Sequence, residues 1–426
     1  MRNARCRTQG LVRDSPRRAR NAAGGGRQGS STAGILSPTP SEILSAAERA
    51  AVAGNADALA AFLTRHPDLF RDHPHFAGGD ARAIIAAFHQ FDNWAAFEAY
   101  AAALKQPESE IAAFEAAVEA IVAGDLSGLL RILHARPALV HERSARRHHA
   151  TLLAYVGANG VEDFRQKTPA NIVDIAELLM RGGADINAVA DLYGGSTTLG
   201  LAATSVHPAK AGVQRALIDA LLAHGATFDR AVAPGYTDGL VVNACLANGR
   251  GDAAAHLASR GAALDLEGAC GVGRLEVVRQ FLDAAGGLTG GATDTQLRSG
   301  FLWACEYGRR NVVEFLLRLP IDLRPKHRGV TGLHWAAHGA HAAIARLLVD
   351  AGFGVDVADD RWSGTPLDWA LHGWQDPPPE AIDEEYYATV SLLRARGAGA
   401  APSWIDNPRV RADSRMRSAL NDSVQR

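Results

Sequence analysis

Residues 329–352 carry apolar side chains at helical spacing in two short segments that a turn separates. Gly329 suits a turn with positive φ before the first segment, and Thr331 is placed to cap the helix that follows. Gly352 lies where the glycine after a helix C-terminus belongs. The positions that the spacing predicts to be buried are Leu333, Ala336, Ala337, Ile344, Leu347 and Leu348. The pattern therefore predicts two antiparallel helices that pack on each other.

The same pattern recurs along the chain. The phrase TGLHWAA at 331–337 is followed, 34 residues later, by TPLDWA at 365–370. Weaker copies of one helix or both lie at 151–155, 176–185, 197–203, 217–226, 244–262, 268–278 and 303–313, with more degenerate ones at 50–55 and 120–125. A T-P-L-x-x-A phrase that recurs about every 33 residues resembles the ankyrin repeat. We count roughly nine such units between about residues 41 and 400.

This resemblance implies a fold and a class of function. We expect an all-α ankyrin-repeat solenoid of roughly nine stacked helix-turn-helix units, with degenerate repeats at the N-terminus. The expected parts are a disordered basic tail (1–40), an N-terminal helical or degenerate ankyrin-like region (41–110), the ankyrin repeat domain (111–400) and a loose C-terminal tail (401–426). Ankyrin repeats recognise unrelated targets with one scaffold, so the resemblance implies a protein-interaction module without catalysis or a cofactor, and it leaves the partner unidentified.

Residues 81–104 fit the repeat poorly. They predict a helix, a break at 91–94 and a second helix, with Asp92 as its N-cap. The element is similar to one that precedes ankyrin repeats in many bacterial proteins. A divergent repeat of full length remains the alternative.

The composition limits the classes of function. Hydrophobic residues make up 47% of the chain but aromatic residues only 6%, which favours thin helix pairs built from Ala, Leu and Val over a large aromatic-lined cavity. The net charge of −2 does not favour nucleic acid as a partner. Residues 1–40 hold eight Arg and one acid, a charge of +7. They predict a disordered tail or an over-extended start, and the alternative is a targeting or anion-binding segment.

Other features of the composition indicate the organism and the cellular compartment of the protein. Arg outnumbers Lys 40 to 4 beside abundant Ala and Gly, which suggests a GC-rich bacterial genome. Cys245, Cys270 and Cys305 fall at or next to small-residue positions of the expected helices, and they predict buried thiols in a reducing cytoplasm. No run of 18 apolar residues is present, so we expect no membrane span.

Three repeats carry insertions between their first and second helices. The distance from the opening threonine to the closing glycine is 21 residues in the unit at 331–352, 32 in that at 151–183, 28 in that at 197–225 and 32 in that at 365–397. Insertions at one point of a repeat project from one edge of a solenoid, where partners often bind. The first two inserts, 156–169 and 205–212, belong to consecutive repeats and should lie side by side.

We call these two inserts, together with the inter-repeat loops 143–149 and 191–193, the ridge. It combines both signs of charge with aromatic side chains, and we expect it to bind a protein partner. The candidate contact residues are His149, Tyr155, Asp163, Arg165, Lys167, Asp191, Tyr193 and His207. One alternative is that loops simply tolerate insertions and collect polar residues. Another is an enzyme or small-ligand sensor, which would gather polar groups of residues 141–210 in a closed cleft.

The C-terminal repeats offer further candidates. Trp362 lies in an inter-repeat loop and is expected to be an exposed binding anchor, whereas Trp335 and Trp369 are either anchors or core. The third insert, 375–387, is acidic. It either attracts a basic partner or covers the last repeat.

His334 and His338 are four residues apart on an expected helix, a spacing at which two histidines can share a metal ion. No HExxH motif accompanies them. In ankyrin-like repeats, a histidine at the place of His334 usually forms a hydrogen bond across the repeat interface. We therefore expect a structural role and no metal site.

Overall fold

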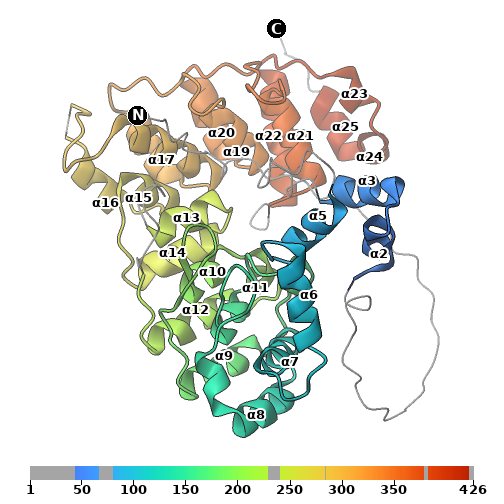
Figure 1. The fold of residues 1–426 in the computed structure, drawn as a ribbon. Helices are drawn as coiled ribbons and strands as arrows, with labels where there is room; N and C mark the ends of the chain where they lie inside the picture. The colour runs from blue at the N-terminus through green and yellow to red at the C-terminus, as the bar shows by residue number, and fades with distance from the viewer. Residues whose placement is uncertain (1–43, 67–79, 229–239, 284, 379–381, 422–426) are drawn as a thin grey trace, which may run out of the picture. The chain divides into compact units, whose positions relative to one another are not determined.

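Residues 44–66, 80–228, 240–283, 285–378 and 382–421 are described by the computed structural model of this protein (Figure 1). The chain divides into two compact units, residues 1–253 and 254–426, which we describe separately. The described residues are mainly helical, and the only strands among them are β1 (Val189–Ala190) and β2 (Ser196–Thr197), which pair antiparallel. The predicted all-α fold is confirmed. The predicted basic tail, 1–40, lies outside the described residues.

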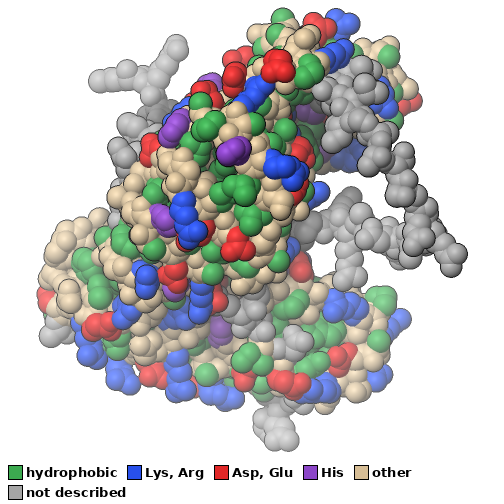
Figure 2. Space-filling model, turned by 90° about the horizontal axis from the view of Figure 1, so that it is seen from below, with side chains coloured by type: hydrophobic (Ala, Val, Ile, Leu, Met, Phe, Trp, Pro, Cys, Tyr) green, Lys and Arg blue, Asp and Glu red, His purple; other side chains and the backbone are tan. Residues whose placement is uncertain are grey.

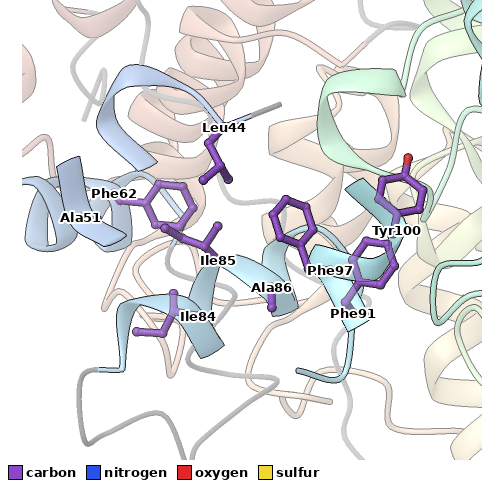
Figure 3. Close-up of a cluster of buried hydrophobic side chains, with 9 residues drawn as sticks. All are labelled: Leu44, Ala51, Phe62, Ile84, Ile85, Ala86, Phe91, Phe97 and Tyr100. Carbon is purple, nitrogen blue, oxygen red and sulfur yellow. The ribbon is translucent and has the colours of Figure 1, made fainter. Parts of the chain in front are cut away.

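The described part of the first unit begins with four helices that we call the N-terminal helical element: α2 (Ala46–Val52), α3 (Ala56–Arg65), α5 (Ala81–Phe88) and α6 (Trp94–Ala103). Their buried side chains form one hydrophobic cluster, in which the rings of Phe91 and Tyr100 lie 4.8 Å apart (Figure 3). The predicted helix, break and helix at 81–104 are confirmed. The N-cap of α6 is Asn93, whose Oδ1 accepts a hydrogen bond from Ala96 N at 2.9 Å, so the prediction of Asp92 is wrong by one residue.

The repeats of the first unit follow as helices joined by turns. Their elements are α7 (Glu110–Ala123), α8 (Leu126–Ala135), the 3-10 helices η2 (Pro137–His141), η3 (Leu152–Gly157) and η4 (Asp163–Arg165), α9 (Ile172–Arg181), α10 (Thr198–Thr204), α11 (Val206–Lys210), α12 (Gln214–Ala223) and α13 (Val241–Ala247). The helix α14 (Gly251–Ser259) crosses the boundary between the units. η3 takes the place of a first helix and packs against α7 and α10.

The second unit repeats the pattern more regularly. Its elements are α15 (Leu266–Val272), α16 (Leu275–Val278), η5 (Arg279–Phe281), α17 (Asp294–Glu306), α18 (Arg310–Leu317), α19 (Gly332–His338), α20 (Ala342–Asp350), α21 (Pro366–Gln375) and α22 (Asp383–Ala395). The first helices stack in the order α15, α17, α19 and α21, each packed against the next (Figure 1). Each unit therefore buries its apolar side chains mainly between consecutive repeats.

Close packing between first helices depends on pairs of small residues. A Cβ added to Gly300 would lie 2.9 Å from Cys270 Cβ, and a Cβ added to Gly332 would lie 2.9 Å from Cys305 Sγ. Both thiols are buried, and burial raises their pKa well above its ordinary value, so they stay protonated and unreactive. The prediction that these cysteines act as small buried apolar residues is confirmed.

The turns of the best repeat have the predicted form. Gly329 and Gly352 have φ angles of 84°. Thr331 N donates a hydrogen bond to His334 Nδ1 at 3.1 Å, which leaves the other ring nitrogen to donate to Gly364 O at 3.3 Å. The expected structural role of His334 is confirmed by this contact between repeats. Within the described ranges, no group of three or more His, Cys, Asp or Glu side chains could hold a metal ion.

The C-terminal segment differs from the prediction of a loose tail. It forms three short helices, α23 (Pro402–Ile405), α24 (Pro408–Ala412) and α25 (Ser414–Asn421), and α25 packs against α22. Met416 and Leu420 are buried, Trp404 Nε1 donates to Asp368 Oδ1 at 2.8 Å, and Arg415 forms an ion pair with Glu384. Glu384 of the third insert is therefore paired within the chain, and residues 402–421 cover the last repeat.

Charged side chains of both signs are mixed on the face that Figure 2 shows, in keeping with a net charge of −2. Among the helices that the structure describes, none is both long and apolar enough to cross a lipid bilayer.

We predict that Gly332→Ala lowers the free energy of unfolding by about 1–3 kcal/mol, because the new Cβ has no room beside Phe301 and Cys305. Gly200→Ala is the matched control, since Gly200 also lies in the first turn of a first helix and its Cβ would meet nothing nearer than Thr197 Oγ1 at 3.7 Å. The control should be neutral or slightly stabilising, because alanine favours the helix. Urea denaturation followed by circular dichroism measures both variants, and an equal response would contradict the packing argument.

Candidate partner-binding site

The ridge has a frame of backbone hydrogen bonds in the first unit. Ser144 N donates to Ala150 O at 2.9 Å and closes the loop that precedes η3. Asp191 N donates to His148 O at 2.8 Å, which joins this loop to the turn between β1 and β2. The two inter-repeat loops of the ridge are therefore fixed side by side.

Both inserts are attached to this frame. Ser205 Oγ donates to Ala158 O at 2.9 Å, so the second insert contacts the first. Asn159 Nδ2 donates to Thr204 Oγ1 at 2.8 Å, while Asn159 Oδ1 accepts from Tyr193 OH at 3.1 Å. The prediction that the two inserts lie together is confirmed by these contacts.

Buried charges hold the first insert against the helix α7. Arg165 Nη1 lies 2.5 Å from Glu115 Oε2, and Arg165 Nη2 lies 2.6 Å from Glu119 Oε1. Arg146 Nε lies 2.5 Å from Glu162 Oε1. Arg146, Arg165, Glu115 and Glu162 are all buried, so two positive charges balance two negative ones inside the protein. We call these four residues the charge cluster.

His148 and Tyr155 complete the polar contacts of Glu162. His148 Nδ1 accepts a hydrogen bond from Ala150 N at 3.1 Å, so its proton is on Nε2, which lies 3.2 Å from Glu162 Oε1. The ring of His148 therefore accepts a hydrogen bond on one side and faces the carboxylate of Glu162 on the other. Tyr155 OH donates to the same oxygen at 3.2 Å, and burial raises the pKa of this phenol well above its ordinary value.

The acidity of Glu162 reflects these neighbours. Burial alone would raise the pKa of this carboxyl. The hydrogen bond from His148 and the charges of Arg146 and Arg165 outweigh that effect and lower the pKa to about 2. Glu162 is therefore ionised at neutral pH, as the neighbouring arginines require.

Three non-glycine residues of the ridge have left-handed backbone conformations. The φ angles are 46° at His149, 45° at Ala158 and 52° at Tyr193. Side chains rarely adopt this region, and it persists only where the surroundings enforce it. The contacts above supply that enforcement, so these residues are held in fixed positions.

Two aromatic side chains stand out on the surface of the ridge. Tyr193 is 53% exposed and Phe164 is 47% exposed. His149 Nδ1 and Asp191 Oδ2 form an exposed ion-pair contact at 2.7 Å. Phe164 was not among the predicted contact residues. The signal available in the sequence was an aromatic side chain within a polar insert.

The structure places the predicted contact residues in different surroundings. His149, Lys167, Asp191 and Tyr193 are exposed, and His207 is partly buried. Tyr155 and Arg165 are buried in the polar contacts of the charge cluster, so in this arrangement they cannot touch a partner and we remove them from the set. The side chain of Asp163 lies outside the described residues.

Trp362 belongs to the second unit and is 51% exposed. Its loop is fixed by Asp359, which accepts hydrogen bonds from Trp362 N at 2.7 Å and from Trp369 Nε1 at 3.0 Å. Trp335 and Trp369 are buried and form part of the core. The predicted exposure of Trp362 is confirmed, and its role in binding stays a prediction.

We predict that Arg165→Ala lowers the free energy of unfolding of the first unit by about 3–5 kcal/mol, because it removes the closest partner of buried Glu115 and leaves the charge cluster with an excess negative charge. Lys167→Ala, two residues along the same insert but exposed, should change it by less than about 0.5 kcal/mol. Urea denaturation, with hydrogen exchange of α7 as a readout local to this unit, tests both. Similar values for the two variants would contradict the proposed weight of the cluster.

We also predict a loss of stability in acid. Glu48 lies on α2, where its Oε1 is 3.0 Å from His89 Nε2. Glu48 and Glu162 have native pKa values of about 2, because hydrogen bonds and neighbouring charges outweigh their burial, whereas an unfolded glutamate titrates near 4.5. The unfolded chain therefore binds more protons between about pH 5 and 2, and the free energy of unfolding falls as the pH falls through this range. Urea midpoints from pH 6 to pH 3 measure this slope. Glu162→Gln should flatten it, and an unchanged slope in that variant would contradict the assignment.

Residues 301–376, which run from α17 to the end of α21, match the family model described as ankyrin repeats (3 copies). The crystal structure of the human ASB11 ankyrin repeat domain is similar over 67% of this chain and 99% of that domain, with 20% sequence identity and a TM-score of 0.34. None of the curated proteins matches the chain. With its stacked helix pairs and the match over residues 301–376, the chain contains ankyrin repeats in its second unit.

Proposed function

We propose that this protein binds another protein through the ridge of its first unit. Ankyrin repeats are in general modules of protein–protein interaction, and they supply the class of function. The observation that carries the choice of surface is the exposure of Tyr193 and Phe164 on a backbone that buried contacts hold in place. Large aromatic side chains of this kind dominate the binding energy of many interfaces.

The fixed frame favours binding because little order has to be gained. A loop that is disordered before binding must lose conformational freedom when a partner arrives, which weakens the complex. The hydrogen bond from Tyr193 OH to Asn159 restrains the aromatic ring before any contact is made. The ridge therefore resembles a preorganised surface more closely than a flexible one.

Charged residues around the aromatic pair would act at the edge of the interface. Lys167, His149 and Asp191 are exposed and carry both signs of charge. Edge charges of this kind mainly affect the rate of association and the choice of partner. Trp362 is a second candidate anchor, on the second unit.

The rival proposal of an enzyme or small-ligand sensor has less support. Its expected sign was a perturbed titratable group in the 141–210 region, and Glu162 and Tyr155 fit that description. Both side chains are almost fully buried, however, and both take part in the polar contacts of the charge cluster. Their altered pKa values support a structural role.

The setting that we propose is a bacterial cytoplasm. The thiols of Cys245, Cys270 and Cys305 are free and buried, which is compatible with a reducing compartment. The excess of Arg over Lys supports the bacterial origin.

We predict that Tyr193→Ala weakens binding of the partner by about 30-fold, or roughly 2 kcal/mol, because it removes an exposed aromatic anchor. Phe164→Ala should act in the same direction. A partner is first recovered by affinity capture with the full chain, and its affinity for each variant is then measured by titration. Circular dichroism verifies that the variants remain folded.

Leu130→Ala is the matched control for this experiment. Leu130 is 54% exposed, close to the exposure of Tyr193, but it lies on α8 and outside the ridge. Its removal should leave the affinity unchanged within about twofold. Equal affinities for all three variants and the unaltered chain would remove the ridge as the binding surface.

A further inference from the structure

The loop 146–149 contacts two different parts of the first unit. On one side, Arg147 N donates to Gln90 O at 2.8 Å, and Arg147 Nε lies 3.7 Å from Asp92 Oδ1. Both of these partners belong to the turn between α5 and α6 of the N-terminal helical element. On the other side, His148 O accepts from Asp191 N, and His149 pairs with the Asp191 side chain. Three consecutive residues therefore join that element to the turn 191–193 of the ridge.

Arg146 makes the strongest of these connections. Its Nη1 donates to His89 O at 2.7 Å, and its Nη2 donates to Tyr100 OH at 2.8 Å. Its Nε faces Glu162 Oε1 of the first insert at 2.5 Å. The guanidinium group also lies 4.9 Å from the centre of the Tyr100 ring, and only 2% of the residue is exposed.

The geometry of these contacts suits arginine alone among the basic residues. A guanidinium group is planar and presents donors in three directions. Here two donors reach the backbone carbonyl of His89 and the phenol of Tyr100, and the charged group lies against the carboxylate of Glu162 in the ridge. A lysine ammonium group is a single point of charge and cannot reach all three acceptors from one position.

We propose that Arg146 is the positioning residue of the ridge, and that the N-terminal helical element is thereby a working part of the binding site. The biological use of this role rests on the proposed function. Arg146 itself is buried and touches no partner. It acts through Glu162, which precedes exposed Phe164 by two residues, and through the loop that carries His149 and its contact with Asp191.

The order of the ridge depends on its contacts with the N-terminal helical element. If α5 and α6 separate from the repeats, Arg146 loses its hydrogen bonds to His89 and Tyr100, and Glu162 is left with a displaced counter-charge. The loop 146–149 and the turn at 191–193 should then open together. Contacts with the N-terminal helical element therefore set how well the ridge is ordered.

Hydrogen exchange measured by mass spectrometry on the full-length protein tests this proposal. In Arg146→Lys, peptides covering 145–151 and 187–195 should exchange about tenfold faster or more, because hydrogen bonds of a charged donor are lost. A peptide covering α9, residues 172–181, should exchange at its original rate. Tyr100→Phe removes the hydroxyl to which Arg146 Nη2 donates and keeps the other contacts of Arg146, and it should give a smaller rise of about threefold in the same two peptides.

Arg147→Lys is the matched control, since it makes the same chemical change at the adjacent residue, which is more exposed and pairs less closely. It should leave all three peptides within about twofold of the original rates. The proposal is overturned if Arg146→Lys leaves 145–151 and 187–195 unchanged, if α9 accelerates equally, or if Arg147→Lys has the same effect. No partner enters this readout. If the Tyr193→Ala experiment shows that the ridge does not bind the partner, the positioning role of Arg146 stands and only its biological use is lost.

Discussion

The balance of two arginines and two glutamates inside the first unit is the constraint on which the ridge depends. A buried charge without its partner is costly, so each member of the charge cluster is stable only while the others are in place. Glu115 belongs to a repeat helix, Arg146 to an inter-repeat loop, and Glu162 and Arg165 to an insert. The cluster therefore joins three segments that are distant in the sequence. The exposed ring of Phe164 lies between two members of the cluster, Glu162 and Arg165, in the same insert.

The repeat architecture could be predicted because its signals are local. Thr331, Gly329 and Gly352 act through turns and caps that involve residues a few positions away, and the structure has them as expected. Cysteine positions on first helices were also predictable, because stacking demands small side chains there. The C-terminal helices were missed since α23 and α24 have only four and five residues, too few to display a helical period. Their order comes from contacts with α21 and α22.

The candidate site was only partly predictable for a related reason. The insert lengths identified the right segments, but not which side chains face outward. Arg165 reads as a surface residue in a polar insert, yet it is buried because Glu115 lies 50 residues earlier and faces it. Tyr155 is likewise buried, and its hydroxyl donates a hydrogen bond to Glu162. Sequence periodicity carries no information about such pairs, whereas the exposure of Tyr193 follows from a short turn that the sequence does display.

The C-terminal helices have a consequence for the design of longer arrays. Asp368 caps α21 through one carboxylate oxygen, which accepts from Thr365 N at 2.7 Å, and binds the Trp404 indole through the other. α25 covers α22 in the same way that a following repeat would. A helix pair added directly after α22 would compete with residues 402–421 for the same atoms. Extra repeats are therefore better inserted between existing repeats of the second unit, where each new interface copies one that is already present.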